Sequence, residues 1–404
     1  MKNSFRRGVA GLLAGVGAAL SGTAFAAADP ANFVLPTGFV EYGDAQSYSL
    51  GVACAVVGAS GPGCPFYVTS TPGAIKDLIV VATGASGGGV TTNVAGIDDA
   101  YGTPSGVSGS TFFTTRDSGA GVNVTGVENN LTTTWDASVG ALNTFLGASS
   151  QGLVFFFNNN QTNSGAATNQ RLAAWAQIWL TNPGGALVTD SVFYFTNQFA
   201  NGNAGSLAGN GIYSPEPSNG CFSTGGNPNI NAGLGGPCDP SVMNFKGPQG
   251  AASLSILPGV ASATQTDYVL SGGQICLNSA NTAVPCSSPT AVTAVNNNLG
   301  ANQAAYALVF PELNAMLAGL KNAAGEDRYT LHLDVQLGCD PIFTTTAACI
   351  GKSLNNGFEQ IFIGALAAPG TPPPPIPEPA SLALVGLALA GLALVSSRRR
   401  KAAV

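Results

Sequence analysis

The feature that most constrains this chain is an apolar segment without charge near its C-terminus, Ala380–Ser397. At about 1.5 Å per helical residue it reaches roughly 27 Å, enough to cross a thin bilayer. The basic cluster Arg398, Arg399, Arg400 and Lys401 follows directly. Because basic flanks stay in the cytoplasm, the pattern predicts a single transmembrane helix over 380–397 and a cytoplasmic tail over 398–404. All earlier residues are then expected outside the cytoplasmic membrane.

The N-terminus predicts how the chain leaves the cytoplasm. A basic start, Lys2 to Arg7, precedes the uncharged run Gly8–Leu20 and the small-residue site Ala24–Ala26. This layout is typical of a secretory signal peptide, here 1–26, and the apolar run is too short to span a bilayer stably. Cleavage within 26–28 is a second alternative. The secretion translocon is therefore the first expected partner.

A proline-rich linker, 367–379, separates the exported part from the predicted span. Its run Pro372–Pro379 cannot form a helix or a sheet strand, so it is expected to stay extended. It ends in Pro377, Glu378 and Pro379.

This Pro-Glu-Pro, followed by an apolar span and an arginine cluster, resembles the PEP-CTERM sorting signal of Gram-negative bacteria. The resemblance implies that an exosortase recognises the tail and cuts it near the motif. The precursor would be anchored in the inner membrane, and the mature form would be at the cell surface or extracellular. Family members often accompany exopolysaccharide and biofilm genes. A plain single-span anchor with a proline hinge remains the alternative. Val94–Tyr101 and Leu354–Gln360 also resemble uncharacterised proteins with such tails, and no activity is attached to them.

The charge distribution restricts the partners of the exported part. The whole chain has a formal charge of −6, but half of its fourteen Lys and Arg lie in the two end segments. The middle keeps seven basic residues and nineteen carboxylates, a net charge of −12. An acidic domain without a basic patch argues against nucleic acid as a partner. A charged content of 8% with 45% hydrophobic residues indicates a packed domain rather than disorder.

Eight cysteines, all in the exported part, predict disulfides because that compartment is oxidising. Pairing of sequence neighbours is the favoured arrangement, since each pair brackets a loop-like segment. A zinc site is disfavoured because no Cys-x-x-Cys occurs and the single histidine is not beside a cysteine. The predicted pairs are Cys54 with Cys64, Cys221 with Cys238, Cys276 with Cys286, and Cys339 with Cys349.

The middle of the chain, 27–366, predicts a mainly β, sandwich-like ectodomain with one or few helices and long disulfide-clamped loops. One large sandwich and two packed subdomains both remain open at this length. The turn at 182–185 predicts a hairpin, and Tyr329–Leu337 alternates apolar and polar residues cleanly. A helix is expected from Pro311, with Leu313, Met316, Leu317 and Leu320 on one face. Further strands are expected at 77–83, 152–157, 175–180, 191–195 and 358–363, and an irregular insertion at 200–260.

Catalytic motifs are weak. His332 would need a nucleophile, and the single candidate is Ser86 in a Gly-x-Ser-x-Gly string that no helix follows. Asp334 lies two residues from His332 on the same strand face, and a structural histidine, solvent-facing or covered by a loop, is the alternative. The adjacent carboxylates Asp98–Asp99 and Glu326–Asp327 point to opposite faces of a strand, so they are not acid–base pairs for a glycosidase.

Binding motifs are equally sparse. Asp98 and Asp99 are weak calcium candidates, with solvated turn carboxylates as the alternative. Trp175, Trp179 and Asn158–Asn160 are weak sugar-binding candidates, with core packing as the alternative. No cofactor is indicated.

Two functions follow. The first is a non-catalytic surface or matrix protein, sorted through its tail and associated with exopolysaccharide or biofilm. The second is a secreted carbohydrate-binding or carbohydrate-hydrolysing protein. A large cleft lined by carboxylates and exposed aromatics favours the second, and a compact sandwich with shallow loops favours the first.

Overall fold

The structure, a computed structural model of the whole chain, describes fourteen segments of the exported part: 33–36, 40–42, 44–70, 79–84, 94–103, 112–115, 127–147, 152–158, 174–195, 275–284, 289–296, 303–321, 323–338 and 359–367. The predicted signal peptide, proline-rich linker, membrane span and basic tail lie outside them, as does the insertion predicted at 200–260. Within the described residues, the helices are too short or too polar to cross a membrane.

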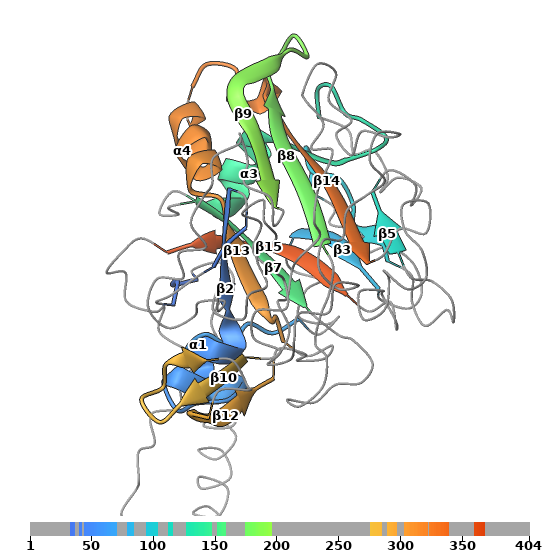
Figure 1. Cartoon of the computed structure of the whole chain (residues 1–404). Coiled ribbons are helices and arrows are strands. Elements are labelled where there is room, and N and C mark those ends of the chain that lie inside the picture. Colours follow the sequence, from blue (N-terminus) through green and yellow to red (C-terminus); the bar gives the residue numbers. More distant parts are fainter. Residues whose placement is uncertain are drawn as a thin grey trace, which may run out of the picture.

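Strands dominate the described residues, in agreement with the predicted fold class (Figure 1). The first sheet has the order β1-β2-β13-β7-β15-β3-β4, with β1 Val40–Tyr42, β2 Ala45–Ser49, β13 Tyr306–Val309, β7 Gly152–Asn158, β15 Gln360–Leu366, β3 Ile79–Thr83 and β4 Tyr101–Gly102. The second has the order β5-β14-β8-β9, and β6 also pairs with β14; its strands are β5 Phe112–Thr114, β14 Thr330–Gly338, β8 Ala174–Thr181, β9 Leu187–Phe195 and β6 Trp135–Ser138. A small third sheet contains β11 Ala283–Val284, β10 Ile275–Asn278 and β12 Ala291–Val295.

The inner strands of the first sheet, β13, β7, β15 and β3, are buried on both faces, which explains why they are nearly continuous apolar runs. Alternate side chains of β7 point to opposite sides, so Leu153, Phe155 and Phe157 join one core cluster while Val154 and Phe156 join another. β15 follows the same rule, with Ile361 and Ile363 in the first cluster and Phe362 in the second.

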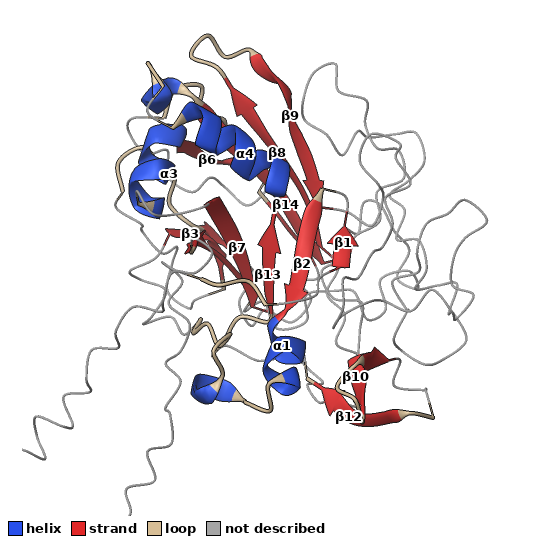
Figure 2. Cartoon of the chain, turned by 90° about the vertical axis from the view of Figure 1, so that its left-hand side faces the viewer, coloured by secondary structure: helices blue, strands red, loops and turns tan. Residues whose placement is uncertain are grey.

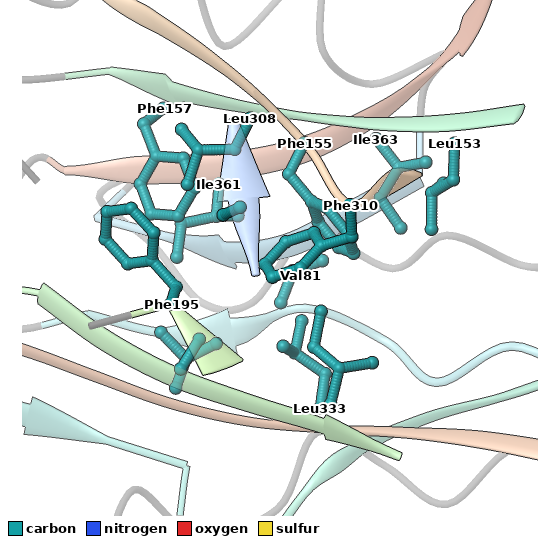
Figure 3. Packing of buried hydrophobic residues seen from close by; sticks show 14 of the residues in the cluster. Val81, Leu153, Phe155, Phe157, Phe195, Leu308, Phe310, Leu333, Ile361 and Ile363 are labelled. Atoms are coloured by element: carbon teal, nitrogen blue, oxygen red, sulfur yellow. The ribbon is translucent and has the colours of Figure 1, made fainter. Parts of the chain in front are cut away.

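The larger cluster fills the space between the two sheets (Figure 3). Phe157 stacks on Phe195 from β9 at 6.2 Å between ring centroids, and Leu333 from β14 also points into this layer. Side chains from two sheets thus interdigitate as in a β-sandwich. The void that remains among them is only about 10 Å³, so the layer is tightly packed.

The second cluster covers the outer face of the first sheet and joins the two ends of the described chain. Phe33 is fully buried, and its ring meets Phe156 edge-on at 4.9 Å. Its backbone N–H donates to the Ala365 carbonyl at 2.8 Å, and its carbonyl accepts from the Ala367 N–H at 2.9 Å. The start of the domain is therefore held against the residue where the predicted linker begins.

Three α-helices and two 3₁₀ turns complete the described elements. They are α1 Leu50–Val56, α3 Val139–Leu146, α4 Pro311–Leu320, η2 Gly61–Gly63 and η6 Glu326–Arg328. Figure 2 shows α3 and α4 at one end of the sandwich and α1 with β10 and β12 at the other. The helix predicted from Pro311 is confirmed as α4. Helices α1 and α3 were not predicted, and each begins at a serine side chain, Ser49 or Ser138, that accepts a backbone N–H.

The strand predictions are confirmed with shifted ends, and the predicted hairpin joins β8 to β9. Asn182 forms its turn, because its side-chain oxygen accepts from the Gly184 and Ala186 N–H groups. Gly185 adopts a φ of 77°, which favours glycine. Of the predicted disulfides, Cys54–Cys64 is present. Cys276 is also disulfide-bonded, but its predicted partner Cys286 lies outside the described residues, as do Cys221, Cys238, Cys339 and Cys349.

Helix α4 also extends the first sheet through one side chain. Strand β13 ends at Val309, and beyond it the buried Asn314 of α4 takes the place of a strand beside β7. Its Oδ1 accepts from the Leu153 N–H at 2.8 Å and its Nδ2 donates to the Leu153 carbonyl at 3.0 Å. One amide therefore satisfies two backbone groups in the interior.

Replacing Asn314 should destabilise the fold. Asn314→Ala leaves two buried backbone groups without these partners and is expected to cost about 2 kcal/mol or more of unfolding free energy. Asn314→Asp keeps the acceptor but places a carboxylate oxygen against the Leu153 carbonyl, so at neutral pH it should cost at least as much. Chemical denaturation measures both. Glu312→Ala, on the exposed side of the same helix, is the control, and an Asn314→Ala variant as stable as that control would contradict the account.

Candidate functional site

The polar face of β14 forms a buried row. Thr330, His332 and Asp334 are fully buried and Gln336 nearly so. His332 lies opposite Trp179 on β8 and Asp136 on β6. The solvent-facing alternative for His332 is therefore wrong.

The His332 imidazole is bonded at both nitrogens. Nδ1 lies 2.9 Å from Oδ1 of Asp136, and Nε2 lies 2.9 Å from Oγ1 of Thr181 at the end of β8. The indole of Trp179 stacks on the ring at 5.1 Å. Carboxylate, imidazole and hydroxyl thus form a chain across three neighbouring strands.

Asp136 is held in this chain by further donors. Its Oδ1 accepts from the Thr134 hydroxyl at 2.6 Å, and its Oδ2 accepts from the Leu131 N–H at 2.5 Å. Its backbone N–H donates to Oδ2 of Asp98 at 3.0 Å, and the Asp98 N–H donates to the Asp136 carbonyl at 2.9 Å. These bonds fix the segment around Asp98 against β6.

Asp98, a predicted calcium candidate, is therefore a buried acceptor of protein hydrogen bonds. Its second oxygen accepts from the Asn130 amide at 3.2 Å. The expectation of a solvated turn carboxylate is wrong at this position, while Asp99 is half-buried. In the described part of the chain, His, Cys, Asp and Glu form no group of three that could hold a metal ion.

An acid–histidine–hydroxyl chain can activate a hydroxyl as a nucleophile when substrate reaches that hydroxyl. Here the carboxylate and the imidazole have no exposed surface, and Thr181 is 8% exposed. The pockets described below are lined by other residues. In this setting the three groups hold β6, β14 and β8 in register, because each lies on a different strand.

The structure places the other predicted site residues apart. Asp334 accepts from the Thr115 hydroxyl at 3.1 Å. His332, two residues earlier, is hydrogen-bonded to Asp136 and not to Asp334. Ser86 lies outside the described residues. Glu326 accepts from the Asn143 amide at 2.6 Å, while the exposed Asp327 lines an open hollow of about 490 Å³.

The two predicted sugar-binding residues whose side chains the structure describes, Trp179 and Asn158, are buried. Trp179 is 1% exposed, and the side chain of Trp175 is outside the described part. Asn158 is buried and its amide donates to the Ser70 hydroxyl at 3.1 Å. Trp179 therefore packs inside the fold, as the core-packing alternative expected.

A pocket of about 210 Å³ lies beside α1, which Figure 2 shows at the opposite end of the sandwich from α3 and α4. Its walls come from α1, from the disulfide loop that follows it, from the end of β12, and from the residues that precede β13. Two half-buried aromatic residues, Phe66 and Tyr67, line it together with Ser60, Asn296 and Gln303. The described lining contains no charged side chain.

The pocket wall is fixed by covalent and hydrogen bonds. The Cys54–Cys64 disulfide joins α1 to the loop. The Tyr67 N–H donates to the Cys64 carbonyl at 3.0 Å, and the Ala304 N–H donates to the Val68 carbonyl at 2.8 Å. The sequence pointed to the disulfide, but the pocket was missed because its walls are far apart along the chain.

Glu359 is a buried acid whose pKa is strongly raised. It directly precedes β15 and is 1% exposed, and loss of solvation raises its pKa from the ordinary 4.5 to about 8. The unfolded chain releases this proton near pH 4.5, whereas the folded chain keeps it up to about pH 8. The contribution of Glu359 to the free energy of unfolding is therefore fully present below pH 4.5. It is lost as the pH rises to about 8.

Glu359→Gln should remove this pH dependence. We expect the variant to exceed the wild type in unfolding free energy at pH 8 by a few kcal/mol in order of magnitude, and to differ much less at pH 4. Denaturant titrations across this range provide the measurement. The control is Glu312→Gln, an exposed acid. If the unfolding free energies of Glu359→Gln and wild type change with pH in parallel, then Glu359 does not keep its proton in the folded chain.

Comparisons with known proteins divide the chain into two parts. A model described as a domain of unknown function (DUF8239) matches residues 33–336, and a model of the PEP-CTERM protein-sorting motif matches residues 375–400. No curated protein and no solved structure matches the chain.

Proposed function

Since the chain belongs to the DUF8239 family and ends in a PEP-CTERM motif, we propose that its ectodomain is a non-catalytic component of the cell surface or extracellular matrix. The motif marks a protein that is exported and sorted through an exosortase. We further propose that the chain leaves the cytoplasm through the secretion translocon and associates with exopolysaccharide in a biofilm.

The observation that carries the proposal is the order of parts at the C-terminus. β15 ends at Leu366, Ala367 is held by Phe33, and the matched sorting segment begins only at residue 375. A cut near Pro377–Pro379 would therefore leave every strand of the two large sheets in the released product. Cleavage that leaves the folded domain intact is what a protein needs if it acts at the cell surface after sorting.

The buried polar row supports a structural rather than catalytic role. His332 is bonded at both ring nitrogens, and neither it nor Asp136 has exposed surface. A hydrolase would need substrate beside the Thr181 hydroxyl. The same row has a plain structural use, since it satisfies buried polar groups on three strands.

Processing can be tested by intact mass. Protein from wild-type cells should end near Pro377–Pro379, whereas a Pro377→Ala, Glu378→Ala, Pro379→Ala variant should keep its full C-terminus and stay in the membrane fraction. Pro373→Ala, in the same linker but before the motif, is the control and should be cut normally. A cut that persists in the triple variant, or in cells without the exosortase, would contradict sorting through this motif.

The non-catalytic role can be tested with Thr181→Val, which removes the hydroxyl but keeps the shape of the side chain. Cells that lack the protein should lose biofilm mass, and Thr181→Val should restore it in proportion to the protein displayed. A cost of about 1 kcal/mol in stability is expected, because the variant removes the hydroxyl partner of His332 Nε2. Normal display without restoration would identify Thr181 as a catalytic group. Unchanged biofilm in the deletion strain would remove the matrix role.

A further inference from the structure

The pocket beside the Cys54–Cys64 disulfide has the properties of a site for a neutral ring. Its described lining contains no charged side chain, although the exported part of the chain has a net charge of −12. An ionic ligand would find no counter-charge among the described lining residues, and binding it there would require uncompensated desolvation. The ligand class is therefore uncharged.

The lining also combines apolar area with polar groups that can form hydrogen bonds. Phe66 and Tyr67 supply aromatic surface, and Leu50 adds an aliphatic wall. Asn296 and Gln303 each carry an amide, and Ser60 a hydroxyl, so donors and acceptors are both present. A sugar ring matches this set, because its C–H faces pack on aromatic rings while its hydroxyl groups bond to amides.

The size of the pocket limits the ligand to one ring. A cavity of about 150 Å³ holds benzene, so the 210 Å³ here has room for one six-membered ring with substituents. The open side would let such a ring be one unit of a longer chain, either at its end or in its middle.

The walls are in place before a ligand arrives. The disulfide fixes α1 to the loop, and Gln303 lies in an antiparallel bridge with Thr69, two residues beyond Tyr67. A preformed site avoids the ordering cost that would otherwise weaken a small-ligand interaction.

We propose that this pocket binds one neutral hexose or N-acetylhexosamine unit of a polysaccharide. The proposal deepens the matrix role and rests on it for the source of the sugar, while the pocket itself stands on its own geometry. A single unit in a site this small is expected to bind at about 1 mM, so retention on a polymer would come from many copies of the protein or many sugar units.

The test is saturation-transfer NMR with the mature protein recovered from cells and free glucose, galactose, mannose and N-acetylglucosamine at millimolar concentration. At least one sugar should receive saturation from the protein. Tyr67→Ala and Gln303→Ala should each weaken its binding by about tenfold. Tyr329→Ala replaces a tyrosine that is also half-buried but lies beside α3, and it should leave binding unchanged. Circular dichroism confirms that each variant is folded.

Two outcomes overturn the proposal. In one, none of the four sugars binds the folded wild-type protein. In the other, a sugar binds equally well to Tyr67→Ala, Gln303→Ala and wild type, which places it elsewhere. A mature protein that is cut and displayed normally but binds no sugar would remove this inference and leave the proposed surface role intact. A protein that binds sugar but is not sorted would remove the proposed surface role and leave this inference intact.

Discussion

The fold depends on the pairing of β15 between β7 and β3, at the centre of the first sheet. Seven residues of β15 pair with β7, although about 200 positions separate the two strands. Ile361 and Ile363 enter the inter-sheet core, and Phe362 enters the outer cluster. The matched family segment ends at residue 336, before this strand, yet the sheet is incomplete without it. Such long-range contacts form slowly. Because β15 is the last described strand along the chain, the first sheet can be completed only after nearly all of the domain has been exported.

The position of β15 also relates the fold to the sorting tail. Phe33 bonds to Ala365 and Ala367, so the first described residue and the last strand hold each other. The linker therefore leaves from a part of the domain that is packed on both faces. Cutting the tail near residues 377–379 removes none of these contacts. A cut before residue 366 would remove part of β15 from the first sheet. The physical domain and the sorting signal are thus separable at the proline-rich linker, as their sequences suggest.

The sequence predicted those elements whose pattern lies within one short segment. The alternation of Tyr329–Leu337, the Asn182 turn and the Pro311 helix depend on local spacing, and each is present. It failed where tertiary contacts decide the environment. β14 alternates as a half-exposed strand would, yet both of its faces are buried, and His332 pairs with Asp136 rather than with nearby Asp334. Asp136 lies on a strand of four residues, too short for a periodic signal. The pocket likewise joins residues near 60 with residues near 300, which no local pattern connects.

The low charge of the chain links these observations. A domain with 8% charged residues relies on Ser, Thr, Asn and Gln for its polar groups. Inside the sandwich such residues bond to neighbouring strands, as Thr181 does to His332 and Asn314 does to Leu153. At the surface the same residue types give an uncharged hydrogen-bonding face, as in the pocket with Asn296 and Gln303. Salt screens charge–charge attraction but weakens neutral hydrogen bonds and aromatic packing much less. A surface of this kind suits adhesion to an uncharged hydroxyl-rich polymer outside the cell, where ionic strength varies.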